Sequence, residues 1–135
     1  MATVARATVG ELTALDALAG GGAEMLRAPE IGLVMVRGRI GGDGAPFNLG
    51  EATVTRAAVS LPGGVIGFGH VLGRDREKAR LAALADALWQ APATRDAVEA
   101  LLAPVRERIA AETALKRERA AATRVDFFTM VRGDN

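Results

Sequence analysis

The sequence contains no cysteine and a single histidine, His70. Without cysteine, this polypeptide alone cannot form disulfides, thiolate nucleophiles, cysteine-ligated zinc sites or iron–sulfur clusters. One histidine cannot supply the histidine pair of a common metal site. The only serine, Ser60, does not stand in the context of a nucleophile elbow. The sequence therefore shows no self-sufficient active site, and we expect this chain alone to bind no metal and no cofactor.

Aromatic residues and net charge are also scarce. Aromatic residues make up 4% of the 135 residues although the hydrophobic fraction is 50%, so alanine supplies much of the apolar content and the core should be thin. Seventeen basic and sixteen acidic residues leave a formal charge of +1, which gives no general field for nucleic acid. We find neither a signal-peptide pattern nor an apolar run of membrane-spanning length. We expect one cytoplasmic domain, residues 1–135, that binds neither nucleic acid nor membrane.

The middle of the chain has the pattern of an antiparallel meander. A β-rich apolar run begins at Ile31, and the glycines of residues 41–44 supply the positive-φ positions of a tight turn. The returning strand is predicted over residues 51–61 and a third strand over residues 65–72. Short links between consecutive strands favour antiparallel pairing. The predicted fold class is therefore α+β: a meander of three to four strands with two to three helices.

Helical periodicity dominates the sequence on both sides of this meander. Residues 9–18 predict a short helix that ends at three glycines, and Asp75 is placed to cap a helix that ends before Pro92. A further helix is predicted from Asp96, with Glu99 as its capping-box partner.

Two features modify this last helix. Pro104 should kink or restart it. Beyond Ile109 the apolar stripe fades into alanine and charge, and Glu112 and Lys116 have the spacing of a helical ion pair. A helix with so little to bury either stands exposed or packs its alanines on something else. Residues 110–135 are thus interpreted as a charged helix followed by a strand-like tail.

Gly67 and Gly69 lie two positions apart in the third predicted strand and therefore share one face. A dinucleotide loop would follow a strand and open a helix, which this segment does not. Two glycines on one face remove side chains and allow a helix or another chain to approach closely, and we favour this packing role.

Four arginines of the predicted sheet are candidate phosphate ligands: Arg37, Arg39, Arg56 and Arg74. Arg37 and Arg39 alternate with a glycine and should project from one face of the first strand. Two adjacent guanidiniums suit a phosphate, whereas the plainer interpretation is a strand edge kept soluble by charge. A cluster of all four arginines requires a strand register that the sequence does not specify.

Other polar residues of this region have plainer interpretations. His70 lies between Phe68 and Leu72 in the alternation, and a partly buried, hydrogen-bonded histidine is favoured over a catalytic one. Asp43 and Glu51 flank the hairpin loop and could serve a metal or act as a base, but an aspartate beside a turn glycine is more often a turn former.

Three stretches resemble the PhnG family of the bacterial carbon–phosphorus lyase system: PEIGLVMVRGRIGGDGAPFNLGEATVTRAAVSL, the following VLGRD and the ending TRVDFFTMVRGDN. The resemblance implies a subunit of a core complex with PhnH, PhnI and PhnJ. It also implies a part in replacing the adenine of MgATP by methylphosphonate, which gives alpha-D-ribose 1-methylphosphonate 5-triphosphate. In that family the nucleosidase-like activity is attributed to PhnI and the radical cleavage to PhnJ, which agrees with the absence of cysteine here.

The ending of the chain is predicted to dock on a partner. Phe127, Phe128, Met130 and Val131 follow a helix that is too polar to form a core. An extended segment can add to a neighbour's sheet while its aromatic side chains fill pockets there. The alternative is that the tail folds back as a fourth strand of the meander.

Three functional hypotheses remain open at this point. The first is a co-catalytic subunit that lends arginines to the triphosphate of MgATP, and the second is an assembly module that contacts no ligand. The third is a free-standing nucleotide-binding enzyme, which would bind ATP in isolation. The isolated chain could also form a homo-oligomer. The first two depend on one idea: this polypeptide does not bury enough of its own apolar surface to be complete.

Overall fold

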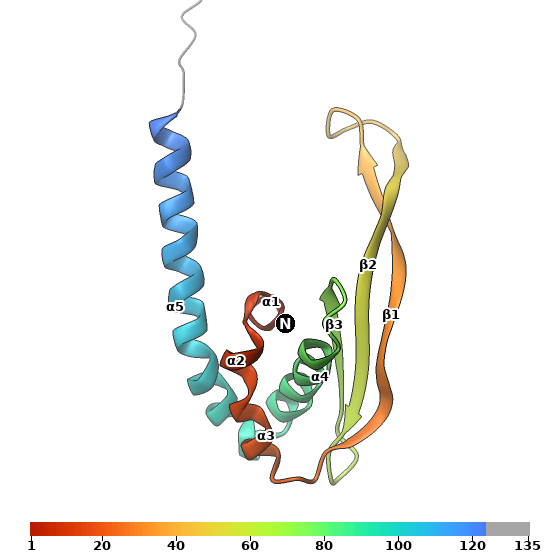
Figure 1. Ribbon diagram of the computed structural model, residues 1–135, viewed down its shortest axis with the longest axis vertical. Helices are drawn as coiled ribbons and strands as arrows, with labels where there is room; N and C mark the ends of the chain where they lie inside the picture. Colours follow the sequence, from red (N-terminus) through yellow and green to blue (C-terminus); the bar gives the residue numbers. More distant parts are fainter. Residues whose placement is uncertain (124–135) are drawn as a thin grey trace, which may run out of the picture.

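The computed structural model describes residues 1–123 and combines helices with one antiparallel sheet (Figure 1). The elements follow in the order α1 (Ala2–Arg6), α2 (Val9–Leu12), α3 (Ala14–Ala19), β1 (Glu24–Arg39), β2 (Pro46–Ser60), β3 (Ile66–Leu72), α4 (Arg76–Gln90) and α5 (Pro92–Ala122). The predicted α+β class is confirmed, with three short N-terminal helices where the sequence predicted a single one. The predicted tail lies outside the described residues.

The sheet is the predicted meander, with strand order β1-β2-β3 and antiparallel pairing throughout. Its strands have unequal lengths, since β1 and β2 have 16 and 15 residues and β3 has 7. The last paired residue of β3 is Leu72, opposite Val54. The β1–β2 hairpin therefore continues beyond β3 as a two-stranded ribbon, which is visible above β3 in Figure 1. Both strands begin earlier than predicted, since the sequence pattern placed their first residues at Ile31 and Glu51.

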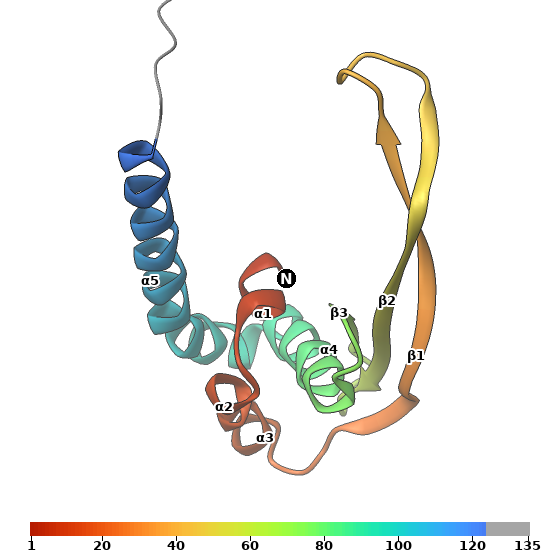
Figure 2. The ribbon, with the colours of Figure 1, turned by 45° about the horizontal axis from the view of Figure 1, so that its top comes forward.

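Helix α4 forms the centre of the core. As predicted, Asp75 caps it, and its Oδ1 accepts a hydrogen bond of 2.9 Å from the N–H of Lys78. The helix is buried on nearly all sides because it lies between the sheet and the other helices (Figure 2). Its buried residues are all alanine or leucine: Ala79, Leu81, Ala82, Ala83, Leu84, Ala85, Ala87 and Leu88.

The two glycines of β3 allow α4 to lie directly on the sheet. A Cβ atom at Gly67 would stand 2.2 Å from the carbonyl oxygen of Ala83, and one at Gly69 would stand 2.2 Å from that of Ala79. No side chain fits in that space. The predicted packing role of these glycines is confirmed, and a helix is what approaches them.

Helix α5 runs from Pro92 to Ala122 as one assigned helix of 31 residues. The prediction of a start at Asp96 with a Glu99 capping box was wrong, because Pro92 at the first position opens the helix earlier. Pro104 lies inside and does not restart it. The helix bends in its first half, the part that contains this proline (Figure 2).

The second half of α5 projects from the body of the protein and is exposed along nearly its whole length (Figure 1). Glu112 pairs with Arg108 at 2.6 Å and, within the described residues, forms no bond to Lys116. The expected exposed, charged helix is therefore present over residues 110–122.

Candidate functional site

The face of the sheet opposite α4 carries no covering element within residues 1–123, and we call it the bare face. Exposure alternates along β3: Gly67, Gly69 and Val71 are buried against α4, while the residues between them are exposed. Phe68 is 56% exposed and Leu72 is 79% exposed. Large apolar side chains of β3 therefore point into solvent from this face of the sheet.

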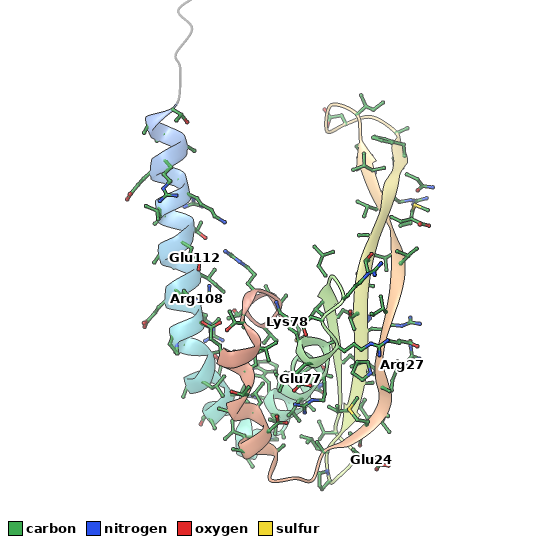
Figure 3. All side chains as sticks on the ribbon, in the orientation of Figure 1. Glu24, Arg27, Glu77, Lys78, Arg108 and Glu112 are labelled. Atoms are coloured by element: carbon green, nitrogen blue, oxygen red, sulfur yellow. The ribbon has the colours of Figure 1, made fainter. Side chains whose placement is uncertain are left out.

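Ion pairs cross the bare face between β1 and β2. Glu30 accepts bonds of 2.6 Å from Arg56 and 2.9 Å from Arg27. Figure 3 shows Arg27 on the side of the sheet that faces away from α4. The bond from Arg56, followed by the charges of both arginines, lowers the pKa of Glu30. Because these side chains are about half exposed, the pairs contribute little to stability.

The second exposed surface is the part of the hairpin beyond β3, residues 33–53, which we call the distal ribbon. Leu33 is 63% exposed and Leu49 is 67% exposed. Successive residues of a strand point to opposite faces, so both faces of the ribbon carry apolar side chains. The large exposed apolar residues here are Leu33, Val34, Met35, Val36, Ile40, Phe47 and Leu49.

A two-stranded ribbon with apolar side chains on both faces is marginal in water by itself. Contiguous apolar patches beyond a few hundred square ångströms are rare on monomeric proteins and mark interaction sites. The distal ribbon and the bare face adjoin on the same two strands. The structure therefore supports the expectation that this chain leaves apolar surface for another molecule, and places it on the sheet.

The predicted phosphate-binding arginines fall into separate groups. Arg37 and Arg39 lie together near the tip of the distal ribbon, where they line a shallow hollow with Gly42 and Pro46. Nη1 of Arg39 donates a bond of 3.3 Å to the carbonyl oxygen of Gly44. Neither arginine has a carboxylate partner within residues 1–123, so both guanidiniums are available to an anion.

Arg56 and Arg74 lie elsewhere. Asn48, the partner of Arg37 in the register, is eight positions from Arg56 along β2, or about 26 Å. Arg74 follows Gly73, whose N–H donates to Thr53 beside the middle of β2. The register therefore does not bring the four arginines into one cluster, and only the pair near the tip remains a compact phosphate candidate.

The remaining polar candidates do not form a catalytic arrangement. His70 lies exposed on the bare face, so the expectation of a partly buried histidine was wrong. Asp43 lies in the hairpin turn and Glu51 lies within β2 opposite Met35. Within residues 1–123 no group of three or more histidine, aspartate or glutamate residues could hold a metal ion. Among the helices of residues 1–123, none combines the length and the apolar character that a membrane span requires.

Charged contacts that were not predicted from the sequence attach the N-terminal helices to the rest of the molecule. Glu11 accepts bonds of 2.7 and 2.9 Å from Arg108 of α5, which is labelled in Figure 3. Glu11 also forms a capping box with Thr8. The bond from Arg108, with the bond from the Thr8 N–H next, lowers the pKa of Glu11 to about 2. The spacing Thr8-x-x-Glu11 was a readable signal for the cap.

A second contact of this kind joins α3 to α4. Arg80 bonds Asp16 at 2.7 Å and Glu77 at 2.6 Å. These bonds lower the pKa of both carboxyl groups. The Arg80–Asp16 pair and the Arg108–Glu11 pair hold the short helices against α4 and α5, on the side away from the sheet.

A cavity of about 290 Å³ lies among α1, α4 and α5. Three of its polar groups bond to one another: Glu99 accepts 2.6 Å bonds from Trp89 Nε1 and from Arg106. These bonds, the one from Trp89 first, lower the pKa of Glu99. Because Glu99 and Arg106 are already paired, we interpret the cavity as a packing gap between helices.

The predicted docking residues Phe127, Phe128, Met130 and Val131 lie outside the described residues. Their role stays a prediction. The exposed second half of α5 leads to them from Ala110 onwards.

Two comparisons with known proteins agree with each other. The family model described as "Phosphonate metabolism protein PhnG" matches residues 1–133. A protein from Rhizobium meliloti (strain 1021) is 57% identical over 137 residues, which cover 100% of this chain and 88% of that protein. Its name is alpha-D-ribose 1-methylphosphonate 5-triphosphate synthase subunit PhnG.

Proposed function

The chain belongs to the PhnG family, and from this membership we propose that it is a subunit of the carbon–phosphorus lyase core complex. In that complex it takes part in displacing adenine from MgATP by methylphosphonate. The product is alpha-D-ribose 1-methylphosphonate 5-triphosphate. MgATP is the substrate of the complex and not a cofactor of this chain. The complex acts as a transferase, and this chain is not catalytic alone.

The observation that carries this proposal is the exposed apolar surface of the distal ribbon and the bare face. A chain that acted alone would expose these side chains to water at a cost of about 25 cal/mol per Å² of apolar surface. A subunit recovers that free energy on assembly. The proposed partners are PhnI, PhnH and PhnJ, and the proposed location is the cytoplasm.

The chemistry that this chain can add is limited to cations. Displacement at the anomeric carbon develops positive charge on the sugar and needs cations to hold the triphosphate. Arg37 and Arg39 are the described residues best placed to hold the triphosphate, because they lie together without carboxylate partners within residues 1–123. Arg56 fits less well since Glu30 already neutralises it.

A second candidate is an assembly module that holds the nucleosidase-like partner and contacts no ligand. The separation of the four arginines by the strand register favours it, as does the pairing of the charged groups in the helical cavity. In this case the sheet contributes only contacts between subunits.

Reconstitution with the other subunits separates the two candidates. Arg37→Ala and Arg39→Ala should each lower methylphosphonate transfer at least tenfold, with assembly retained, if the arginines bind the triphosphate. Arg56→Ala on β2 and Arg74→Ala in the loop after β3 serve as matched controls. If all four variants assemble and react like the unmodified protein, the arginines do not bind the triphosphate. That result would support the assembly module.

Two further measurements test the other hypotheses. Removal of residues 125–135 should abolish co-purification if the tail is the main docking segment. Calorimetry of the isolated chain with MgATP should show no heat of binding. A measurable heat would instead favour a free-standing nucleotide-binding protein.

A further inference from the structure

The free edges of the sheet are protected to different extents. On β3, the N–H of Phe68 donates to Asp86 at 3.0 Å and the carbonyl of Ile66 accepts from Gln90 at 2.9 Å, so side chains of α4 cover part of that edge. On the first half of β1, Pro29 and two register shifts interrupt the edge. Proline and bulges are common devices against the pairing of a strand edge with another chain.

Residues 31–36 of β1 lack these devices, because the third register shift comes only after them, between Val36 and Arg37. From Ile31 to Val36 the strand pairs with β2 in regular register, and its six residues are uncharged. No strand lies on its other side within residues 1–123. An edge that is long, regular and apolar is the type of edge that pairs with a further strand.

The direction of the backbone groups on this edge follows from the register. The N–H of Leu61 donates to Val65 and that of Gly73 donates to Thr53. Because backbone groups point alternately to the two sides of a strand, the N–H and C=O groups of the odd-numbered residues of β2 point towards β3. Those of the even-numbered residues point towards β1. On β1, Gly32 and Val34 therefore bond to β2. The residues whose N–H and C=O groups point outward are Ile31, Leu33 and Met35.

The charges beside this edge indicate the occupant. Arg37 and Arg39 follow the apolar run directly and have no carboxylate partner within residues 1–123. A second copy of this chain that paired through the same strand would not supply one, because its nearest carboxylate, Glu30, is already bonded to two arginines. A strand of a different polypeptide can supply both apolar residues and a free carboxylate.

We propose that residues 31–36 of β1 accept an extended strand of a partner subunit by backbone pairing, with a carboxylate of that strand beside Arg37 and Arg39. The inference rests on the proposed function, since it requires a partner subunit. It adds the place of docking, the mode of docking and the chemistry of the docked segment. It agrees with the assembly module rather than with triphosphate binding by Arg37 and Arg39, because a partner carboxylate would neutralise these arginines. Pairing would also turn the marginal two-stranded ribbon into a three-stranded sheet.

A proline substitution at an outward position tests the backbone pairing. Leu33→Pro removes an outward N–H but no bond between β1 and β2, so the hairpin should remain. Leu33→Ala removes the same side chain and keeps the N–H. With PhnI, PhnH and PhnJ co-expressed as the probe, we expect L33P to lower co-purification at least tenfold more than L33A. Equal recovery of the two variants would overturn the proposal.

Hydrogen exchange on the unmodified protein gives a test that does not depend on how L33P folds. The amides of Ile31, Leu33 and Met35 should exchange rapidly in the isolated chain and at least a hundredfold more slowly in the complex. Unchanged exchange in the complex would refute strand pairing. If the unmodified chain recovers none of the three subunits, the proposed function fails instead, before the docking mode is in question.

The same experiment identifies other occupants of the edge. Protection in the isolated chain that rises with protein concentration would indicate a second copy. Protection that is independent of concentration and disappears when residues 124–135 are removed would indicate the chain's own C-terminal segment. Either result would contradict pairing with a partner subunit.

Discussion

Strand β2 runs through two regions of the molecule that differ in what lies against them. Between Thr55 and Val59 the strand β2 faces α4, and its inward residues are buried. In the distal ribbon the first part of the same strand also carries apolar residues, such as Phe47 and Leu49, and these are exposed. The composition of the strands therefore does not decide their burial. The packing partner decides it, and the distal ribbon lacks one within residues 1–123.

The difference implies that the two regions should respond differently to the same substitution. In the covered region a change should alter the free energy of unfolding of the isolated chain. In the distal ribbon it should alter assembly and leave that free energy nearly unchanged. The following predictions begin with the largest expected effect.

The comparison can first be tested with leucines. Leu84 of α4 is 1% exposed, whereas Leu49 of the ribbon is 67% exposed. Leu84→Ala should lower the free energy of unfolding by roughly 2–5 kcal/mol, because it leaves a cavity in the core. Leu49→Ala should change it by less than about 0.5 kcal/mol but weaken co-purification with the partner subunits. Urea denaturation of the isolated chain and a pull-down measure the two effects. A destabilising L49A would mean that the ribbon is packed within the chain itself.

Glycines give a second matched pair. Gly67→Ala would place a Cβ atom against the backbone of α4 and should cost roughly 1–3 kcal/mol or more. Gly50 of the ribbon has no atom within 4 Å of a Cβ at its position, so Gly50→Ala should be nearly neutral in the isolated chain. Thermal unfolding of both variants provides the measurement. Equal melting temperatures would show that α4 does not lie on β3 as described.

Charge reversal tests the tip of the ribbon. Arg37→Glu should weaken association with the partner subunits about tenfold, since it would place a glutamate beside the proposed carboxylate of the partner strand. The loss should shrink as salt is added, because salt screens the repulsion. Arg76→Glu, at the exposed start of α4, is the matched control and should leave association unchanged. Titration of the isolated chain against the purified partner subunits at two salt concentrations distinguishes the variants. Identical behaviour of R37E and R76E would exclude a role of the tip in docking.

The smallest effect concerns pH and the helical side of the molecule. The pKa of Glu11 is lowered from 4.5 to about 2 by its bonds to Arg108 and Thr8. A carboxyl group whose pKa is lower in the folded state stabilises the fold above its unfolded pKa. That contribution is lost as the pH falls from about 4.5 towards 2. Glu11→Gln should reduce the acid sensitivity of the melting temperature in this range. An unchanged pH profile would mean that the contact between α2 and α5 does not form in solution.

Several local features were predictable from the sequence because neighbouring residues determine them. Asp75 caps α4 with its own side chain, whatever the rest of the chain does. The turn glycines Gly41 and Gly42 take positive φ as the hairpin requires. Gly67 and Gly69 predicted a close packing contact because alternation places them on one face. The same alternation could have predicted the exposure of His70, which lies on the face opposite these glycines.

Other features could not be predicted because they depend on distant residues. The extra length of β1 exists only through pairing with β2, since an isolated strand has no hydrogen-bond partners. The bonds of Arg108 to Glu11 join residues 97 positions apart. The separation of Arg37 from Arg56 follows from the register, which the sequence had left open.

The sequence by itself determined the α+β class, the order of the meander, the cap of α4 and the family, because these depend on local patterns and on long matching segments. Only the tertiary structure decided which apolar residues are covered. One helix covers one face of β3 and of the part of β2 beside it, whereas β1 has no buried residue and the longer β1–β2 hairpin extends beyond the helix. The surface that remains uncovered is a consequence of that difference in length, which no local pattern contains.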